Sequence, residues 1–140
     1  MLFRSRRRVE TEGLEECVRF AGSRTDVPDI LAVADAMVHS SVLAEPGGTV
    51  VIEAMTFGAP VIAASRGGHL DYLAEGLGLV HDVDDPSQLA RHLVFLAEHP
   101  EERRRMSEGA RRRAAEFSID RTARRMEAVY ESLQAPGTRR

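Results

Sequence analysis

Short apolar runs alternate with longer segments of helical periodicity through the first half of the chain, and this alternation restricts the fold more than any other feature. Apolar runs of three or four residues are too short for helices but suit strands buried in a sheet. Strands separated by helical segments are typical of βα units around a parallel sheet. Four strands are therefore expected, at residues 18–21, 36–39, 61–64 and 78–80.

Between these strands, residues 27–34 and 49–57 carry apolar side chains at spacings of three and four, so both are expected to form helices that pack on the sheet. The second helix should end at Gly58, because glycine can adopt the left-handed conformation of a C-cap. After "DVDDPSQ" no further strand is expected, and Ser118 is expected to cap the last helix. Three helices are predicted in this part, at residues 87–98, 101–117 and 119–134.

Composition restricts the possible functions. With 43% hydrophobic residues in 140 positions, the chain suits one domain rather than a two-domain enzyme. All 19 basic residues are arginine, which excludes catalysis through lysine. The net charge of −3 gives no general attraction to nucleic acid, so nucleic acid is not expected as a partner. The single cysteine, Cys17, excludes an intrachain disulfide and is expected to pack in the core.

Location and metal binding can also be considered from the sequence. No apolar run approaches the roughly 18 residues of a membrane helix, and the N-terminal residues lack the apolar stretch of a signal peptide. The chain is therefore expected to be cytoplasmic, without a transmembrane segment. The five histidines show no spacing typical of metal ligands, so no metal site is expected. His39 ends an expected strand and is interpreted as a structural residue rather than a base.

The stretch AEPGGTVVIEAM, residues 44–55, leads from the second expected strand into the following helix. Gly47, Gly48 and Thr49 form the start of that helix, where free backbone N–H groups and a partial positive charge can bind a phosphate without a basic side chain. The glycines would also let a ligand approach the backbone. Glycine-rich turns occur in purely structural helices as well, so the pattern alone leaves ligand binding and simple capping equally open.

Two glutamates flank this turn. Glu45 lies within it, beside the groups beyond a bound phosphate, and Glu53 lies one turn into the helix. An ionised carboxylate can accept two hydroxyl hydrogen bonds, as from the diol of a ribose. A second turn, at Gly67 and Gly68, follows the third strand at the carboxyl-terminal edge of the sheet, where open α/β sheets bind ligands. If these turns bind a ligand and do not merely cap helices, the residue types favour a ligand with hydroxyls and phosphates.

The segment DVPDILAVADAMVHSSVLAEPGGTVVIEAMTFGAPVIAASRGGHLDYLAEGLGLV closely resembles the C-terminal nucleotide-sugar-binding domain of GT-B glycosyltransferases, specifically the retaining glycosyltransferase family 4. The likeness extends from about residue 18 to residue 130. Glu45 and Glu53 match the E-x₇-E motif of that family. The resemblance implies an α/β fold class: a Rossmann-like parallel sheet with flanking helices, forming part of the C-terminal half of a GT-B fold.

The resemblance also implies roles for the residues of the site. Glu45 would be the catalytic residue that orients the donor sugar, and Glu53 would hold the ribose hydroxyls. Amides at Gly47, Gly48 and Thr49 would meet the diphosphate, and the second glycine turn, Gly67 and Gly68, would complete the donor site. Transfer would occur with retention, the diphosphate leaving group being stabilised electrostatically. The nucleotide-sugar is the substrate, and no cofactor or metal is implied.

This chain departs from the family pattern mainly by what it lacks. Compared with the family, this sequence is expected to lack the N-terminal acceptor domain and the first part of the donor domain, which by the resemblance would supply an arginine and a lysine that neutralise the diphosphate. Smaller departures are Gly47, where the family usually has an aromatic residue, and Asp71, where it usually has glutamate. Arg66 can be interpreted either as a phosphate contact or as a surface loop residue.

The chain is accordingly expected to form a single partial domain over residues 1–140. Its expected parts are a helix remnant at 1–16, the βα core with the donor site at 17–82, C-terminal helices at 83–134 and a tail at 135–140. The expected function is that of a glycosyltransferase donor domain, inactive in isolation. An alternative is a non-catalytic nucleotide-sugar-binding fragment or the remnant of a split gene. A third, a GT-B-like epimerase, is disfavoured by the E-x₇-E motif.

The incomplete sheet predicts a partner for the chain. Without its flanking strands, the edge beside residues 18–21 is unpaired, and unpaired edges invite association. The chain is therefore expected either to associate with itself through this edge or to pair with a separately encoded N-terminal domain.

Overall fold

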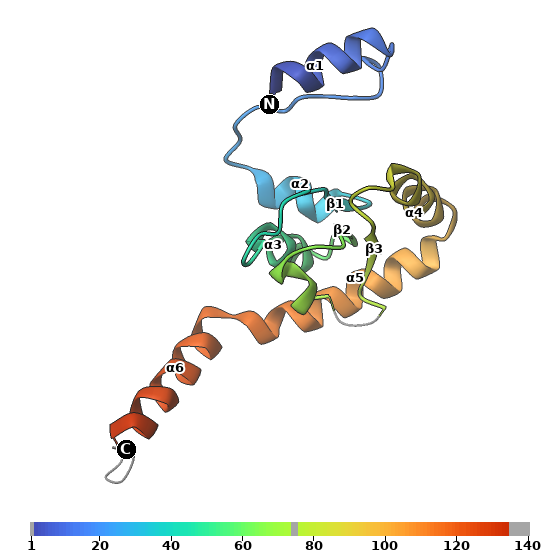
Figure 1. Ribbon diagram of the computed structural model, residues 1–140. Coiled ribbons are helices and arrows are strands. Elements are labelled where there is room, and N and C mark those ends of the chain that lie inside the picture. The colour runs from blue at the N-terminus through green and yellow to red at the C-terminus, as the bar shows by residue number, and fades with distance from the viewer. Residues whose placement is uncertain (1, 74–75, 135–140) are drawn as a thin grey trace.

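The computed structural model describes residues 2–73 and 76–134, so the tail expected at 135–140 lies outside the described residues. Figure 1 shows a small sheet with helices on both sides. Its strands are β1 (Met37–His39), β2 (Val61–Ala64) and β3 (Gly78–His81). Its α-helices are α1 (Leu2–Thr11), α2 (Val27–Val33), α3 (Thr49–Phe57), α4 (Pro86–Glu98), α5 (Pro100–Ala114) and α6 (Ile119–Gln134). Two short 3₁₀ helices are η1 (Gly68–Asp71) and η2 (Ala115–Phe117).

The three strands are parallel and lie in the order β1-β2-β3. His39 at the end of β1 is in register with Ala63, and Ala64 at the end of β2 is in register with His81. The carboxyl ends of all three strands therefore meet at one edge of the sheet. This arrangement confirms the expected α/β fold class and the three predicted strands after residue 35.

The core lies on both faces of β2, whose four residues are all buried, as expected for the central strand of a parallel sheet. Val61 and Ala63 belong to a cluster with α3 and α5 that includes Met55. Ile62 points to the other face and packs with Leu96 of α4 and with α5. Because successive strand residues alternate between faces, one strand holds two helical layers together.

The strand expected at residues 18–21 does not form, and that prediction is wrong. This segment is irregular and mostly exposed, and it lies beside α1, where the Arg6 guanidinium is 4.9 Å from the centroid of the Phe20 ring. Figure 1 shows α1 and the segment after it standing apart from the sheet. A strand requires a neighbour with which to exchange hydrogen bonds, and among the described residues nothing pairs with the outer edge of β1. Cys17, expected in the core, is likewise exposed.

The helix ends follow the predicted capping residues. Gly58 adopts the left-handed conformation at φ 78°, and its N–H donates to the carbonyls of Ala54 and Met55. The Ser118 hydroxyl accepts from the N–H of Arg121 at 3.4 Å at the start of α6. The helix expected to run to residue 117 stops at Ala114, where the chain tightens into η2. In the part of the chain that the structure describes, no helix is long and apolar enough to span a membrane.

Candidate functional site

The two glycine turns meet at the carboxyl-terminal edge of the sheet. The loop from β1 to α3 carries Glu45 and Pro46, and the turn after β2 carries Gly67 and Gly68. The Gly68 N–H donates to the carbonyl oxygen of Glu45 at 2.9 Å. A Cβ at Gly68 would lie only 2.0 Å from the Pro46 carbonyl oxygen. Gly68 is therefore required for the backbone of one turn to pack against the backbone of the other.

The start of α3 offers unpaired donors beside these turns. Gly48 is the N-cap in the left-handed conformation, at φ 57° and ψ 52°, and no side chain caps the helix. The Val51 N–H donates a hydrogen bond to the Gly48 carbonyl oxygen at 2.9 Å. The Thr49 and Val50 amides donate no hydrogen bond to any residue that the structure describes. These amides and the helix dipole make this end of α3 suitable for an anion.

Glu45 is held at this edge by two neighbours. The Ser41 hydroxyl donates to Glu45 Oε1 at 2.6 Å, and His39 Nε2 lies 3.6 Å from Oε2. The hydrogen bond from Ser41 is the main cause that lowers the pKa of Glu45, with His39 and His69 adding to it and desolvation opposing it. The side chain remains 45% exposed. Glu45 is thus an oriented, ionised carboxylate at neutral pH that a ligand can reach.

Glu53 lies on α3 one turn beyond the helix start, with its side chain exposed. Its carboxylate makes no hydrogen bond or ion pair with any residue that the structure describes. The structure thus brings together Glu45, Gly47, Gly48, Thr49, Gly67 and Gly68 around the junction of the two turns. Glu53 is near this junction along α3, but its carboxylate makes no hydrogen bond or ion pair with the other predicted site residues that the structure describes.

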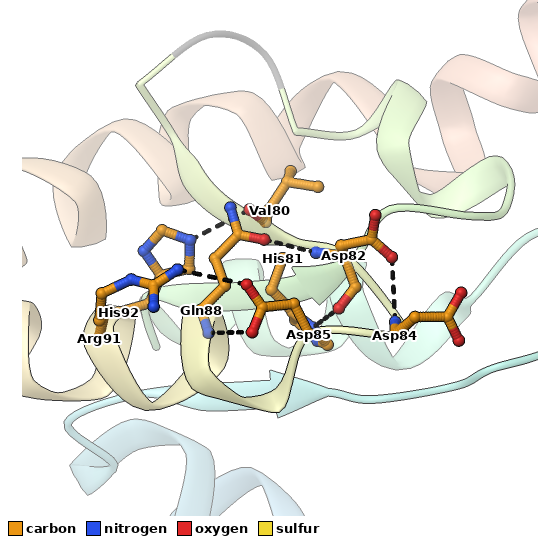
Figure 2. A network of polar contacts seen from close by, with 8 residues as sticks. All are labelled: Val80, His81, Asp82, Asp84, Asp85, Gln88, Arg91 and His92. Atoms are coloured by element: carbon orange, nitrogen blue, oxygen red, sulfur yellow. Dashed lines mark hydrogen bonds and ion pairs between the residues drawn. The ribbon is translucent and has the colours of Figure 1, made fainter.

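The end of the third strand is occupied by structural contacts instead of a binding site. Figure 2 shows the acidic segment after β3 folding back onto the first turn of α4. Asp85 caps α4 by accepting from the Gln88 N–H at 3.0 Å, and the Gln88 side chain accepts from the Asp82 N–H at 2.7 Å. Arg66, for which the sequence left two interpretations, is exposed and pairs with Asp84 at 3.2 Å. This contact favours the interpretation of Arg66 as a surface loop residue.

Sequence reasoning missed three residues of the site. His39 was expected to be structural, and Ser41 and His69 were not assigned a role, yet His39 and Ser41 face the Glu45 carboxylate and His69 lies against both glycine turns. A Cβ at Gly48 would lie 2.8 Å from the His69 Cβ. The only available signal was position, since Ser41 precedes Glu45 by four residues and His39 ends a strand at the ligand edge. Among the described residues no group of His, Cys, Asp or Glu has the geometry to hold a metal ion.

The sequence matches the profile of the family "Glycosyl transferases group 1" over residues 1–113. The chain belongs to this family. The matched range contains the sheet and both glycine turns, and it ends within α5. This chain is 35% identical over 109 residues to spore coat protein SA of Bacillus subtilis, covering 76% of this chain and 29% of that protein. It is also 36% identical over 129 residues to the D-inositol 3-phosphate glycosyltransferase of Salinispora arenicola, covering 89% of this chain and 29% of that protein.

Solved structures show the same fold. The crystal structure of Anabaena Alr3699/HepE in complex with UDP superposes with a TM-score of 0.89 at 27% identity, covering 94% of this chain and 36% of that one. The parallel sheet with flanking helices therefore matches the sheet of GT-B glycosyltransferases. This chain spans about three-tenths of the length of the curated relatives named above.

Proposed function

We propose that this chain is the donor-binding domain of a retaining family 4 glycosyltransferase. Completed by an N-terminal domain, it would transfer a sugar from a nucleotide-sugar to an acceptor. The observation that carries the proposal is the meeting of unpaired amides at the start of α3 with the oriented Glu45 carboxylate at one edge of the sheet. An anion-binding helix end beside a carboxylate that accepts hydroxyl hydrogen bonds suits a sugar diphosphate.

Each residue then has a chemical role. The diphosphate would lie at the amides of Gly48 and Thr49, with Gly47 leaving room for it. Glu53 would accept hydrogen bonds from the two ribose hydroxyls, for which its unpaired carboxylate is suited. Glu45 would orient the donor sugar, and the α3 dipole would stabilise the charge that develops on the leaving diphosphate. Neither a metal nor another cofactor is part of this proposal.

The second glycine turn supports the site from behind. Gly67, at φ 131°, and Gly68 let this turn approach the loop that carries Glu45 so closely that their backbones are hydrogen-bonded. Gly67 and Gly68 would therefore contribute to donor binding by fixing the loop, in addition to any contact of their own amides with the donor. Because the loop is fixed before the ligand arrives, less entropy is lost on binding.

The relatives support this assignment. Alr3699/HepE was crystallised with UDP and with UDP-glucose, and the Salinispora relative is described as a D-inositol 3-phosphate glycosyltransferase. Since this chain spans about three-tenths of such relatives, we expect it to bind a nucleotide-sugar without turning it over by itself. An N-terminal domain encoded separately, or association through the unpaired edge of β1, would supply the partner.

Isothermal titration calorimetry of the chain with UDP, GDP, ADP and UDP-glucose tests the binding role. We expect one nucleoside diphosphate to bind more tightly than the others, and Glu53→Ala to weaken it at least tenfold. Glu98→Ala is the matched control, because Glu98 is an exposed glutamate at the end of α4, on the opposite edge of the sheet. An unchanged affinity of Glu53→Ala would show that Glu53 does not hold the ribose.

A second assay tests turnover. Incubation of the chain with the preferred nucleotide-sugar is expected to release no nucleoside diphosphate beyond the background rate. Addition of a matching N-terminal domain is expected to restore release, and Glu45→Gln is expected to abolish the restored reaction. Release by the chain alone would show that the partial domain is sufficient for catalysis.

A further inference from the structure

Two buried histidines lie behind Glu45 and are unexplained by the donor-binding roles above. His39, the last residue of β1, is 7% exposed, and His69, at the start of η1, is fully buried. Their ring centroids are 4.4 Å apart with an interplanar angle of 53°. Glu45, from the loop after β1, and His69, from η1, are the titratable groups that the structure places against the His39 ring.

The contacts of His69 identify which of its ring nitrogens carries hydrogen. His69 Nε2 lies 2.8 Å from the carbonyl oxygen of Ala64, which can only accept, so Nε2 must donate. His69 Nδ1 is buried and has no partner among the described residues. A hydrogen on Nδ1 would be a buried donor without an acceptor, which is costly, so the neutral ring with hydrogen on Nε2 fits this environment. The hydrogen bond to Ala64 therefore fixes the orientation of the His69 ring, and the His39 ring packs against it.

The same reasoning orients His39. Its Nδ1 is also buried without a partner among the described residues, whereas its Nε2 faces Glu45 Oε2 at 3.6 Å. The favoured ring therefore carries its hydrogen on Nε2 and directs that N–H dipole toward the carboxylate. At 3.6 Å the interaction is electrostatic and is longer than a hydrogen bond. Ser41 holds the other carboxylate oxygen at 2.6 Å, so the two contacts act on opposite ends of one carboxylate.

We propose that His39, supported by His69, is a positioning residue that fixes the Glu45 carboxylate for contact with the donor sugar. This inference rests on the proposed function only in assigning Glu45 to the sugar. Among the described residues, no hydrogen bond or ion pair joins His39 to the α3 amides or to Glu53, which would hold the nucleotide. Loss of His39 should therefore weaken recognition of the sugar and leave recognition of the nucleoside diphosphate unchanged.

The first test needs no ligand. The titration of the Glu45 side-chain carboxyl carbon is followed by ¹³C NMR in the wild type, His39→Leu, His39→Gln and His99→Gln. His39→Leu should raise the pKa of Glu45 part of the way toward the ordinary value of glutamate, because the favourable interaction of the His39 ring with Oε2 is removed while the Ser41 hydrogen bond stays. His39→Gln, whose amide can place an N–H where Nε2 lies, should recover part of the wild-type lowering of that pKa. His99→Gln, an exposed histidine after α4, is the control and should change nothing.

The second test measures the sugar directly. The ratio of UDP-glucose affinity to UDP affinity should fall about three- to tenfold in His39→Leu, with UDP affinity unchanged, and His39→Gln should recover most of the ratio. If the wild-type chain binds neither ligand, the same comparison is made with GDP, ADP and their glucose conjugates. Binding of none of these nucleotides refutes the proposed function, while the titration of Glu45 still decides the positioning role. An identical Glu45 titration in His39→Leu and in the wild type would overturn the inference.

A third measurement covers the case in which His39→Leu does not fold. Glu45 is a partly exposed loop residue, so Glu45→Gln should fold, and the ¹⁵N chemical shift of the His39 Nε2 should change in it because its facing charge is gone. His81, whose Nδ1 contacts the Asp82 carbonyl, provides an internal reference that should not respond. A His39 shift that is the same with and without the Glu45 charge would equally overturn the inference.

Discussion

Gly68→Ala is the substitution that most directly tests the packing of the two glycine turns. A Cβ at this position would lie 2.0 Å from the Pro46 carbonyl oxygen and 2.9 Å from the Pro46 carbonyl carbon. Both are backbone atoms, so no side-chain rotation can relieve the overlap, and the loop carrying Glu45 must move away. The hydrogen bond from the Gly68 N–H to the Glu45 carbonyl would be lost with it.

The expected cost follows from three contributions. Overpacking of this kind costs about 1–3 kcal/mol, and losing the backbone hydrogen bond adds about 1 kcal/mol. Replacing glycine by alanine also reduces the conformational entropy of the unfolded chain, which stabilises the folded state by about 0.4–1 kcal/mol and offsets part of this cost. The free energy of unfolding should therefore fall by about 1–3.5 kcal/mol. At about 4 °C for each kcal/mol in a domain of this size, the melting temperature should fall by ~4–14 °C.

Thermal unfolding followed by circular dichroism measures this change, and Gly47→Ala is the matched control. A Cβ at Gly47 would lie 3.7 Å from the Tyr72 hydroxyl oxygen, an ordinary contact, and Gly47 does not have a left-handed φ. The Gly47 variant should melt within about 2 °C of the wild type, because surface substitutions usually change stability little. If the melting temperature of Gly68→Ala equals that of the wild type and of the Gly47→Ala control, the close approach of the two turns does not stabilise the protein.

Two further substitutions test the rest of the fold. Asp85→Ala removes the N-cap of α4 and should lower the melting temperature at pH 7. The Gln88 N–H is the main cause that lowers the pKa of Asp85, so this stabilisation is present above the unfolded pKa and is lost as the pH falls through the folded pKa. The difference in melting temperature between wild type and Asp85→Ala should therefore shrink below about pH 4, and a constant difference would exclude a charged cap. Ile62→Ala should cost about 2–5 kcal/mol and Ile62→Val about 0.5–1.5 kcal/mol in urea unfolding, because the Ile62 side chain is fully buried between its own strand and helices α4 and α5. Equal stability of the two variants would contradict this packing.

Most of the fold could be predicted because local signals and burial agree. The residues of β2 are apolar and flanked by Pro60 and Ser65, and the structure buries all four of them between two layers of helices. The segment at residues 18–21, which has three apolar residues and Arg19, was also predicted to be a strand, yet it forms none. A strand depends on a hydrogen-bonding neighbour, and the sequence of one segment cannot show whether that neighbour exists. The wrong prediction thus came from a property of the sheet that the segment itself does not contain.

The candidate site was predictable in its residue types but not in its contacts. Glu45 was assigned from its place in the turn, whereas the environment that keeps it ionised comes from Ser41, His39 and His69. His69 is 24 residues away along the chain and reaches Glu45's neighbourhood only because η1 follows β2 at the same edge of the sheet. Long-range packing of this kind leaves no periodic pattern in the sequence.

The glycines show most clearly that sequence pattern alone does not reveal long-range packing. Gly47 and Gly68 look alike in the sequence, since each belongs to a glycine pair in a turn before a helix, and both were predicted to belong to the donor site. The space where a Cβ would lie differs completely: at Gly47 it is open to ordinary contact, and at Gly68 it is filled by the Pro46 carbonyl. Gly68 is therefore required by the protein itself, whereas Gly47 is left available to a ligand. Only a substitution that changes donor affinity without changing the melting temperature can show that a glycine serves binding, and in this site Gly47 is the position where that outcome is possible.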